Sequence, residues 1–222
     1  IKSIRKNAGV HKVCFITKDN YSEYIEIPEH MLQKVAEKKM KLAHLADYIR
    51  IALLEKYGGL WIDTTMYCHR VIPEEYFELP FFTCKSEECD CGYLSRMRWV
   101  TFCIGGYKNN IVFTFLKRAF EEYWKSHDNA IDYLFFDHLI DIAYNNVPAI
   151  KKFIDSVPIN NLHRDDLQAA MNEALPGESF DNIIKDDTVL YKLSWRESYS
   201  EKTADGQESV YGHFLNMKIG EK

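Results

Sequence analysis

Apolar side chains recur at helical spacing along residues 42–59, and this pattern predicts a long helix. One face carries Leu42, Leu45, Ile49 and Leu53, and the opposite faces carry Ala46, Ile51, Ala52 and Leu54. A helix that is apolar all round belongs in the interior of a domain. Gly58 and Gly59 end it, because glycine adopts left-handed backbone angles at little cost. The run LWID at 60–63 then predicts a buried strand.

Weaker patterns predict the remaining elements. β-rich runs predict strands at 11–17, 81–84, 99–107 and 188–195. Helical patterns cover 29–40, 110–126, 130–145, 148–155 and 164–174. Strands separated by helical segments are typical of an α/β domain. We therefore expect a single domain over residues 1–222, which ends in a polar tail at 198–222.

Composition narrows the classes of function. The chain has 222 residues, 46% of them hydrophobic, and a formal net charge of −5. Proteins that bind nucleic acid grip phosphates with clustered Lys and Arg, whereas acidic residues interleave the basic ones here, so we expect no nucleic-acid partner. No run reaches the ~20 apolar residues that cross a bilayer. We expect a cytoplasmic location, with peripheral contact with the inner membrane face.

Two further features concern the cysteines and the start of the chain. Cys84, Cys89 and Cys91 form a cluster, but no second Cys or His pair with ligand spacing accompanies it. Reduced thiols are therefore a simpler interpretation than zinc. The sequence opens at Ile1 without a methionine, so we expect that a segment of the protein precedes it.

Three charged residues are expected to converge at one end of the central helix and strand. From Asp47 the helix climbs ~15 Å over ten residues at 1.5 Å per residue. The glycine pair reverses the chain, and four strand residues return it by ~13 Å. Asp63 should therefore lie level with Asp47, and Arg50 shares the face of Asp47 at a spacing of three residues. Buried charges are costly unless they pair or bind a ligand, so this group is either an internal ion-pair cluster or a ligand site.

The same segment carries a recognisable signature. HLADYIRIALLEKYGGLWIDTT resembles DXD-containing sugar transferases, in which an Asp-x-x-Arg helix precedes Gly-Gly, a strand and Asp-x-Asp. The large glucosylating toxins and the polysaccharide mannosyltransferases have a similar arrangement. The chain most resembles the capsular polysaccharide synthesis protein family, through GG-x-W-I-D-x-T, the later WVTFCIGGYKNN and the helix IDYLFFDHLIDIAY. The resemblance extends from about residue 11 to residue 196.

This resemblance implies a fold and an activity. The fold would be GT-A-like (Rossmann-like), a mixed, mainly parallel sheet flanked by helices, whose first strand would precede residue 1. The activity would be transfer of a hexose from a nucleotide diphosphate sugar, which we expect to be UDP-linked, with the retention of anomeric configuration that most relatives suggest. The acceptor would be a capsular or surface glycan, free or lipid-linked. Catalysis would be positional and electrostatic, because the leaving diphosphate must be neutralised as the glycosidic bond breaks.

The resemblance also assigns roles to residues. Asp47 and Arg50 would contact the donor sugar, and Asp63 would act in catalysis beside the diphosphate. Thr65 departs from the pattern, because the commoner motif has a metal-ligating Asp there. Asp63 and Thr65 therefore make only a weak ligand pair for Mn²⁺ or Mg²⁺. Lys192, on the last expected strand, becomes a candidate for neutralising the diphosphate.

Other candidates have equally good structural explanations. Gly105 and Gly106 either let a ligand approach the backbone or form a tight turn. Asp137, with the histidine after it, resembles the Asp-Gln pair that touches sugar in related transferases, or lies on a polar helix surface. Ser194 and Trp195 resemble a Ser-Trp pair that lines the donor site, or the tryptophan belongs to the core.

Two other functions fit the same sequence. A sugar-phosphate transferase would break the donor's diphosphate and release UMP instead of UDP. A non-catalytic glycan-binding or scaffolding subunit would keep a degenerate site, which Thr65 favours, and would bind neither UDP nor UDP-sugars.

Overall fold

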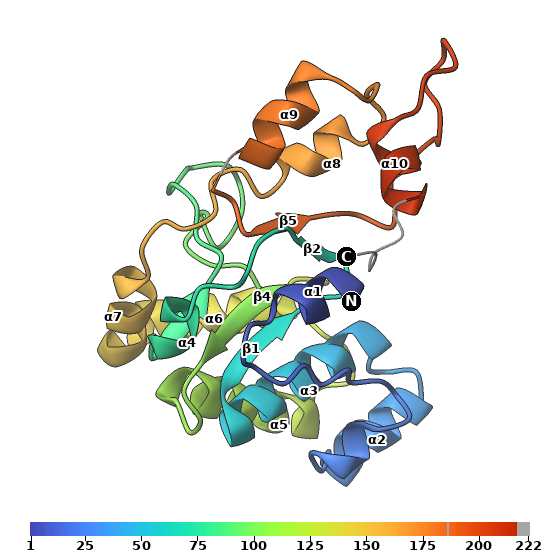
Figure 1. The fold of residues 1–222 in the computed structure, drawn as a ribbon. Helices are drawn as coiled ribbons and strands as arrows, with labels where there is room; N and C mark the ends of the chain where they lie inside the picture. Colours follow the sequence, from blue (N-terminus) through green and yellow to red (C-terminus); the bar gives the residue numbers. More distant parts are fainter. Residues whose placement is uncertain (186, 217–222) are drawn as a thin grey trace. The chain divides into compact units, whose positions relative to one another are not determined.

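The structure, a computed structural model, describes residues 1–185 and 187–216. The chain forms two compact units, and each collects segments that are distant in sequence (Figure 1). The larger unit comprises Cys14–Ile62 and Pro73–Ile159, and the smaller comprises Ile1–Val13, Asp63–Ile72 and Asn160–Lys222. That the whole chain acts as one domain stays a prediction.

A three-stranded sheet belongs to the larger unit. β4 (Cys103–Gly106) lies between β1 (Gly59–Ile62) and β3 (Phe81–Thr83), and both pairings are antiparallel. All four residues of β4 are buried. In the register of the sheet, Gly59 and Phe81 both lie opposite Gly106.

The helices of this unit supply most of the main hydrophobic core, and some of them contact the sheet. The helices are α2 (Glu29–Ala36), α3 (Leu42–Tyr57), α4 (Glu75–Glu78), α5 (Ile111–Ser126), α6 (Phe135–Asn146), α7 (Pro148–Ser156) and the short 3₁₀ helix Tyr21–Glu23. α3 has the expected course and ends at Gly58, whose φ of 69° lies in the left-handed region. Asn110 caps α5 by accepting a hydrogen bond from the backbone of Val112 at 2.8 Å. Within the part of the chain described, no helix is long and apolar enough to span a membrane.

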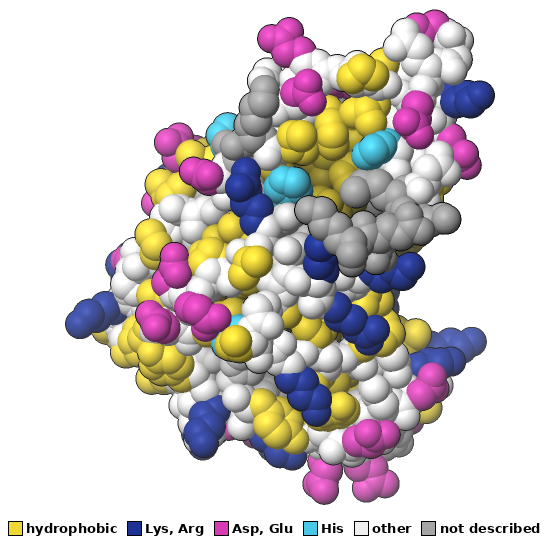
Figure 2. All heavy atoms as spheres, viewed as in Figure 1, with side chains coloured by type: hydrophobic (Ala, Val, Ile, Leu, Met, Phe, Trp, Pro, Cys, Tyr) yellow, Lys and Arg dark blue, Asp and Glu magenta, His cyan; other side chains and the backbone are white. Residues whose placement is uncertain are grey.

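The smaller unit is built around a two-stranded antiparallel ribbon. β2 (Met66–Cys68) pairs with β5 (Leu190–Lys192), and Met66 lies opposite Lys192. The described residues of this unit also form α1 (Lys2–Asn7), α8 (Asp166–Ala170), α9 (Glu178–Lys185) and α10 (Val210–Asn216). A second core gathers here around Leu167, Met171, Tyr191 and Val210. Figure 2 shows hydrophobic and histidine side chains gathered between α9 and α10 on the face in view.

The expectation of a GT-A-like, mainly parallel sheet is wrong. The described residues form two small sheets of three and two strands, and every pairing of named strands is antiparallel. Parallel neighbours need a crossover of a dozen or more residues, usually a helix. The chain between β3 and β4 contains no helix, and the only helix between β1 and β3 is the four-residue α4. The helical patterns in the sequence suggested that helices connect parallel strands. In the structure those helices lie elsewhere in the chain and do not connect neighbouring strands of the three-stranded sheet.

Two local expectations also need correction. Residues 11–17 were expected to form a strand, but they form none. None of their side chains is buried, so the apolar residues of this run do not contribute to a core. The tail is not polar throughout, because α10 forms within it and Val210 is fully buried. Residues 217–222 of that tail lie outside the described part of the chain.

Candidate functional site

The larger unit holds a buried ion pair on α3. Arg50 is only 7% exposed, and its Nη2 lies 3.6 Å from Oδ1 of Asp47. Its Nη1 also donates a hydrogen bond to the carbonyl oxygen of Thr101. The spacing of three residues along a helix brings the two charges to one face, as the sequence predicts. The guanidinium is therefore fixed in direction by a carboxylate and a backbone carbonyl.

Aromatic rings complete the surroundings of this arginine. The guanidinium carbon lies 5.2 Å from the ring centre of Trp61 on β1 and 5.7 Å from that of Phe136 on α6. Both distances permit cation–π attraction, which is stronger where water is excluded. Arg50 thus has a rigid aromatic frame as well as polar partners.

His44 lies one turn before Asp47 and is also buried. Burial lowers the pKa of its imidazole, and nearby Lys41 adds to this effect, whereas Asp132 opposes it. Its Nδ1 is 4.0 Å from Oδ2 of Asp47, beyond hydrogen-bond distance. The neutral form is favoured, which is typical of a core histidine rather than a base.

Asp137 is the acid with the most unusual surroundings in this unit. Its carboxylate accepts a hydrogen bond of 3.1 Å from Nε1 of the fully buried Trp99. Burial raises the pKa of Asp137, and this outweighs the lowering by Trp99, Arg50 and His138. A carboxyl group that holds its proton more tightly than usual is suited to donating hydrogen bonds or protons.

The two glycines of β4 have a structural explanation. A Cβ atom at Gly105 would meet the carbonyl oxygen of Gly59, and one at Gly106 would meet that of Pro80. Glycine is thus required where the neighbouring backbones pass β4. Their proposed contact with a ligand stays a prediction.

The smaller unit contains a second charged group, around Lys192 on β5. Its ammonium donates a hydrogen bond of 2.8 Å to Oγ1 of Thr65 and another of 2.8 Å to the carbonyl oxygen of Leu193. Burial lowers the pKa of Lys192, whereas the carboxylates of Asp63 and Asp165 raise it. The β2–β5 pairing causes this meeting, because Met66 lies opposite Lys192 and the backbone of Leu193 bonds to Thr65 at 2.9 Å. Three sequence candidates, Asp63, Thr65 and Lys192, are thus neighbours in one unit.

The Ser-Trp pair follows β5 in a loop. Ser194 Oγ accepts a hydrogen bond of 3.1 Å from the backbone nitrogen of Arg196. Trp195 is 78% exposed, so it is not a core residue, and the guanidinium carbon of Arg196 lies 5.4 Å from its ring centre. The core explanation of Trp195 is therefore wrong, and its role beside a donor stays a prediction.

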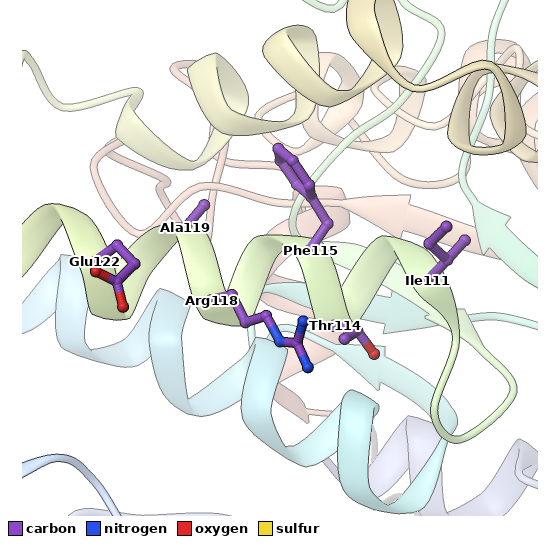
Figure 3. A pocket seen from close by; sticks show the side chains of 6 residues that line it. All are labelled: Ile111, Thr114, Phe115, Arg118, Ala119 and Glu122. Carbon is purple, nitrogen blue, oxygen red and sulfur yellow. The ribbon is translucent and has the colours of Figure 1, made fainter.

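A hollow on the larger unit does not resemble a catalytic site. It lies along α5 and is lined by Ile111, Thr114, Phe115, Arg118, Ala119 and Glu122. Figure 3 shows that all six side chains come from this one helix. Catalytic pockets usually gather polar groups from several elements, and this hollow does not.

The cysteine cluster also differs from the expectation. Cys89 and Cys91 are joined by a disulfide, whereas Cys84 is buried and takes no part in it. The expectation of reduced thiols is wrong for the first two. No group of three or more His, Cys, Asp or Glu side chains with metal-binding geometry occurs among residues 1–185 and 187–216.

Several residues that shape these groups were not singled out from the sequence. Trp61 and Phe136 frame Arg50, and Trp99 holds Asp137. Each lies next to or within a quoted motif, so the motifs themselves were the available signal. The predicted convergence of Asp63 with Asp47 and Arg50 stays a prediction, because the first belongs to the smaller unit and the others to the larger.

Comparison with known families identifies the chain. The model of the capsular polysaccharide synthesis protein family matches residues 1–214. The chain belongs to the capsular polysaccharide synthesis protein family. No curated protein and no solved structure matches the sequence. The family name indicates a part in capsular polysaccharide synthesis, which agrees with the resemblance of the central motif.

Proposed function

We propose that this capsular polysaccharide synthesis protein transfers a hexose from a nucleotide diphosphate sugar, a UDP-sugar, to a capsular or surface glycan. In the reaction the bond between the anomeric carbon and the diphosphate oxygen breaks, and that oxygen keeps the electron pair. The acceptor hydroxyl bonds to the anomeric carbon and gives up its proton. Family membership and the charged group around Lys192 support the proposal.

The carrying observation is a half-buried ammonium held against the end of the WIDTT motif. Lys192 bonds to Thr65, two residues after Asp63, and the Asp63 carboxylate acts on it electrostatically. A diphosphate gains negative charge as it leaves, and a preorganised cation stabilises that charge without reorganising. The Thr65 hydroxyl accepts a bond from Lys192 and can donate its own proton to a phosphate oxygen.

This arrangement does not fit a conventional metal site at Asp63 and Thr65. The Thr65 oxygen that would ligate Mn²⁺ or Mg²⁺ already accepts from an ammonium, which would repel a divalent cation. Magnesium sites usually combine carboxylates with substrate phosphates, and this motif supplies one carboxylate only. In the commoner motif, two carboxylates bind a metal ion that supplies positive charge. In the proposed reaction Lys192 supplies this positive charge instead.

The groups of the larger unit suit recognition of a sugar. Sugar hydroxyls both donate and accept hydrogen bonds, and Asp47 and Arg50 offer an acceptor and a donor fixed by their surroundings. Asp137, with its raised pKa, offers a carboxyl group that can donate. We propose that Asp47 and Arg50 bind the donor sugar and that Asp137 and Asp63 act in catalysis.

The test is slow hydrolysis of a panel of nucleotide sugars, which needs no acceptor. The released nucleotide should be UDP, because UMP would indicate a sugar-phosphate transferase. Asp63→Ala and Lys192→Ala should each lower the rate by about 100-fold or more, the loss typical when a charge-stabilising group is removed. Lys18→Ala, at an exposed lysine of the larger unit, is the matched control and should retain activity.

Absence of both hydrolysis and UDP binding by calorimetry in the wild-type protein would overturn the proposal and favour a scaffolding role. Equal activity of Lys192→Ala and Lys18→Ala would leave transfer possible but remove Lys192 from it.

A further inference from the structure

An exposed apolar patch lies on the larger unit, outside the groups described above. Its members are Leu42, Ile131, Tyr133 and Leu134, which are 72%, 67%, 62% and 41% exposed. Leu42 opens α3, and the other three belong to the loop between α5 and α6. Single exposed apolar residues are ordinary, but a cluster of large ones on loops marks an interaction surface.

The four residues Leu42, Ile131, Tyr133 and Leu134 are called the loop patch below. The two segments that carry them, the start of α3 and the α5–α6 loop, are held together by ion pairs. Lys39, between α2 and α3, forms an ion pair of 3.1 Å with Asp128 of the α5–α6 loop. Lys34 on α2 bonds to the same Asp128 at 2.8 Å and to the carbonyl oxygen of His127 at 2.6 Å. Behind the patch, the rings of His44 and Phe135 are 6.1 Å apart. The apolar side chains therefore project from a braced surface.

The charges around the patch favour an anionic partner. Its acidic residues each have a partner: Glu37 pairs with Lys39, Asp128 pairs with Lys34 and Lys39, and Asp132 lies 2.9 Å from Nε2 of His138. Lys38 and Lys41 are exposed and form no ion pair within the described part of the chain. Two such lysines beside exposed Leu, Ile and Tyr match the composition of surfaces that insert into a membrane interface.

We propose that the loop patch binds an anionic lipid surface, with Ile131, Tyr133, Leu134 and Leu42 entering the headgroup region. Lys38 and Lys41 face the lipid phosphates. Tyrosine suits this depth because its ring is apolar and its hydroxyl stays hydrated. The inference does not depend on the proposed transfer reaction. It gives the chain a peripheral attachment to the membrane surface.

Co-sedimentation of the full chain with vesicles tests this attachment. Vesicles of phosphatidylcholine alone are compared with equimolar phosphatidylcholine and phosphatidylglycerol, at low and high salt. The wild type should sediment with the anionic vesicles and be released by salt. Ile131→Gln with Tyr133→Gln should weaken binding by about tenfold or more, since both of these exposed side chains would enter the membrane interface in the wild type. Lys38→Gln with Lys41→Gln should weaken it by about fivefold per lysine.

Matched controls keep the test decisive. Ile159→Gln changes an exposed apolar residue outside the patch, and Lys18→Gln with Lys108→Gln changes exposed lysines elsewhere on the same unit. These variants should bind as the wild type does. Failure of the wild type to bind anionic vesicles would overturn the proposal, as would equal losses in patch and control variants. A change of oligomeric state in the Ile131 and Tyr133 variant, without loss of vesicle binding, would identify a protein interface and also overturn it.

Discussion

Lys192 shows how one side chain's surroundings can give activity a pH dependence. Burial lowers the pKa of its ammonium, and the carboxylates of Asp63 and Asp165 only partly oppose this. Lys192 therefore loses its proton at a lower pH than an exposed lysine does. We expect kcat/KM for donor hydrolysis to fall on the alkaline side as this proton is lost.

A Lys192→Arg variant isolates that proton, because a guanidinium stays charged at any accessible pH. Its alkaline limb should shift to higher pH, even where its absolute rate is lower. The measurement is kcat/KM against pH for both proteins. Superimposable alkaline limbs would show that another group controls the decline.

Asp137 presents the opposite case, an acid whose pKa burial raises. Between the unfolded and the folded pKa, the folded protein holds a proton that the unfolded chain has released. The free energy of unfolding therefore falls as the pH rises through this window, and the loss is complete above the folded pKa. Asp137→Asn removes the titration and keeps an oxygen that can accept from Trp99.

At neutral pH the Asp137→Asn variant should melt at a higher temperature than the wild type. This difference in melting temperature should vanish at a pH below the unfolded pKa of Asp137. If Asp137 acts in catalysis, activity should fall by about 100-fold in the same variant. Thermal melts across the acidic range and one rate assay measure both. A lower melting temperature at neutral pH would contradict the assigned acidity.

Among the elements, those with local signals could be predicted and those that depend on distant partners could not. The all-round apolar pattern and the glycine pair placed α3 and β1 at the correct positions, but the expectation that this strand is buried is wrong, because no residue of β1 is fully buried. β2 has only three residues, and it is a strand because β5 lies beside it from more than a hundred residues away. α8 lies within the helix predicted at 164–174, whereas α9 and α10 had no such signal, and packing around Tyr191 rather than a long periodic pattern stabilises these short helices.

The same distinction applies to the candidate site. A helical spacing of three residues correctly predicts the Asp47–Arg50 pair. The contact between Thr65 and Lys192 has no local signal, because it depends on the register of β2 against β5. Sequence could nominate Lys192 only as a basic residue on a late strand.

At the level of elements, the glycines of β4 give a test of packing. Gly105→Ala would push a methyl group into the carbonyl oxygen of Gly59 on β1. The backbone of a buried central strand yields little, so we expect a loss of about 3 kcal/mol or more, at the upper end of overpacking costs. Gly92→Ala, with φ of 78° and no atom within 4 Å of the new Cβ, should lose only about 1 kcal/mol.

Chemical denaturation of the two variants provides the comparison. The comparison of the two variants bears on function, because it shows whether β4 needs glycine for packing against β1 or for the approach of a ligand. If Gly105→Ala proved as stable as the wild type and yet lost donor hydrolysis, a ligand rather than β1 would require the glycine.

For the whole molecule, the family match covers residues 1–214 and therefore includes both compact units. The motif that predicted this family begins in the larger unit and ends with Asp63 and Thr65 in the smaller. Sequence thus identified the family correctly, whereas its expected sheet was wrong. The residues of a motif are determined by the chemistry of the site. Whether neighbouring strands are parallel or antiparallel depends on the segments that connect them, which a short motif does not specify.

At the scale of the whole molecule, the proposed reaction needs a source of positive charge. The chain carries a net charge of −5 and would bind a donor that is itself anionic, so neutralisation must be local. Lys192 supplies one positive charge, and Thr65 supplies a neutral oxygen where a second motif carboxylate would recruit a metal. We therefore expect donor hydrolysis in the wild type to be largely retained in the presence of EDTA.

The matched comparison is Lys192→Ala assayed with and without EDTA and with added Mn²⁺. Without the ammonium, the remaining rate should depend more strongly on added metal, because a divalent cation can then approach Thr65 without repulsion. Complete loss of wild-type activity in EDTA, together with an unaffected Lys192→Ala variant, would show that a bound metal neutralises the diphosphate. In that case the charged group on β5 would stabilise the smaller unit only, and the catalytic cation would have to be held by other residues of the chain.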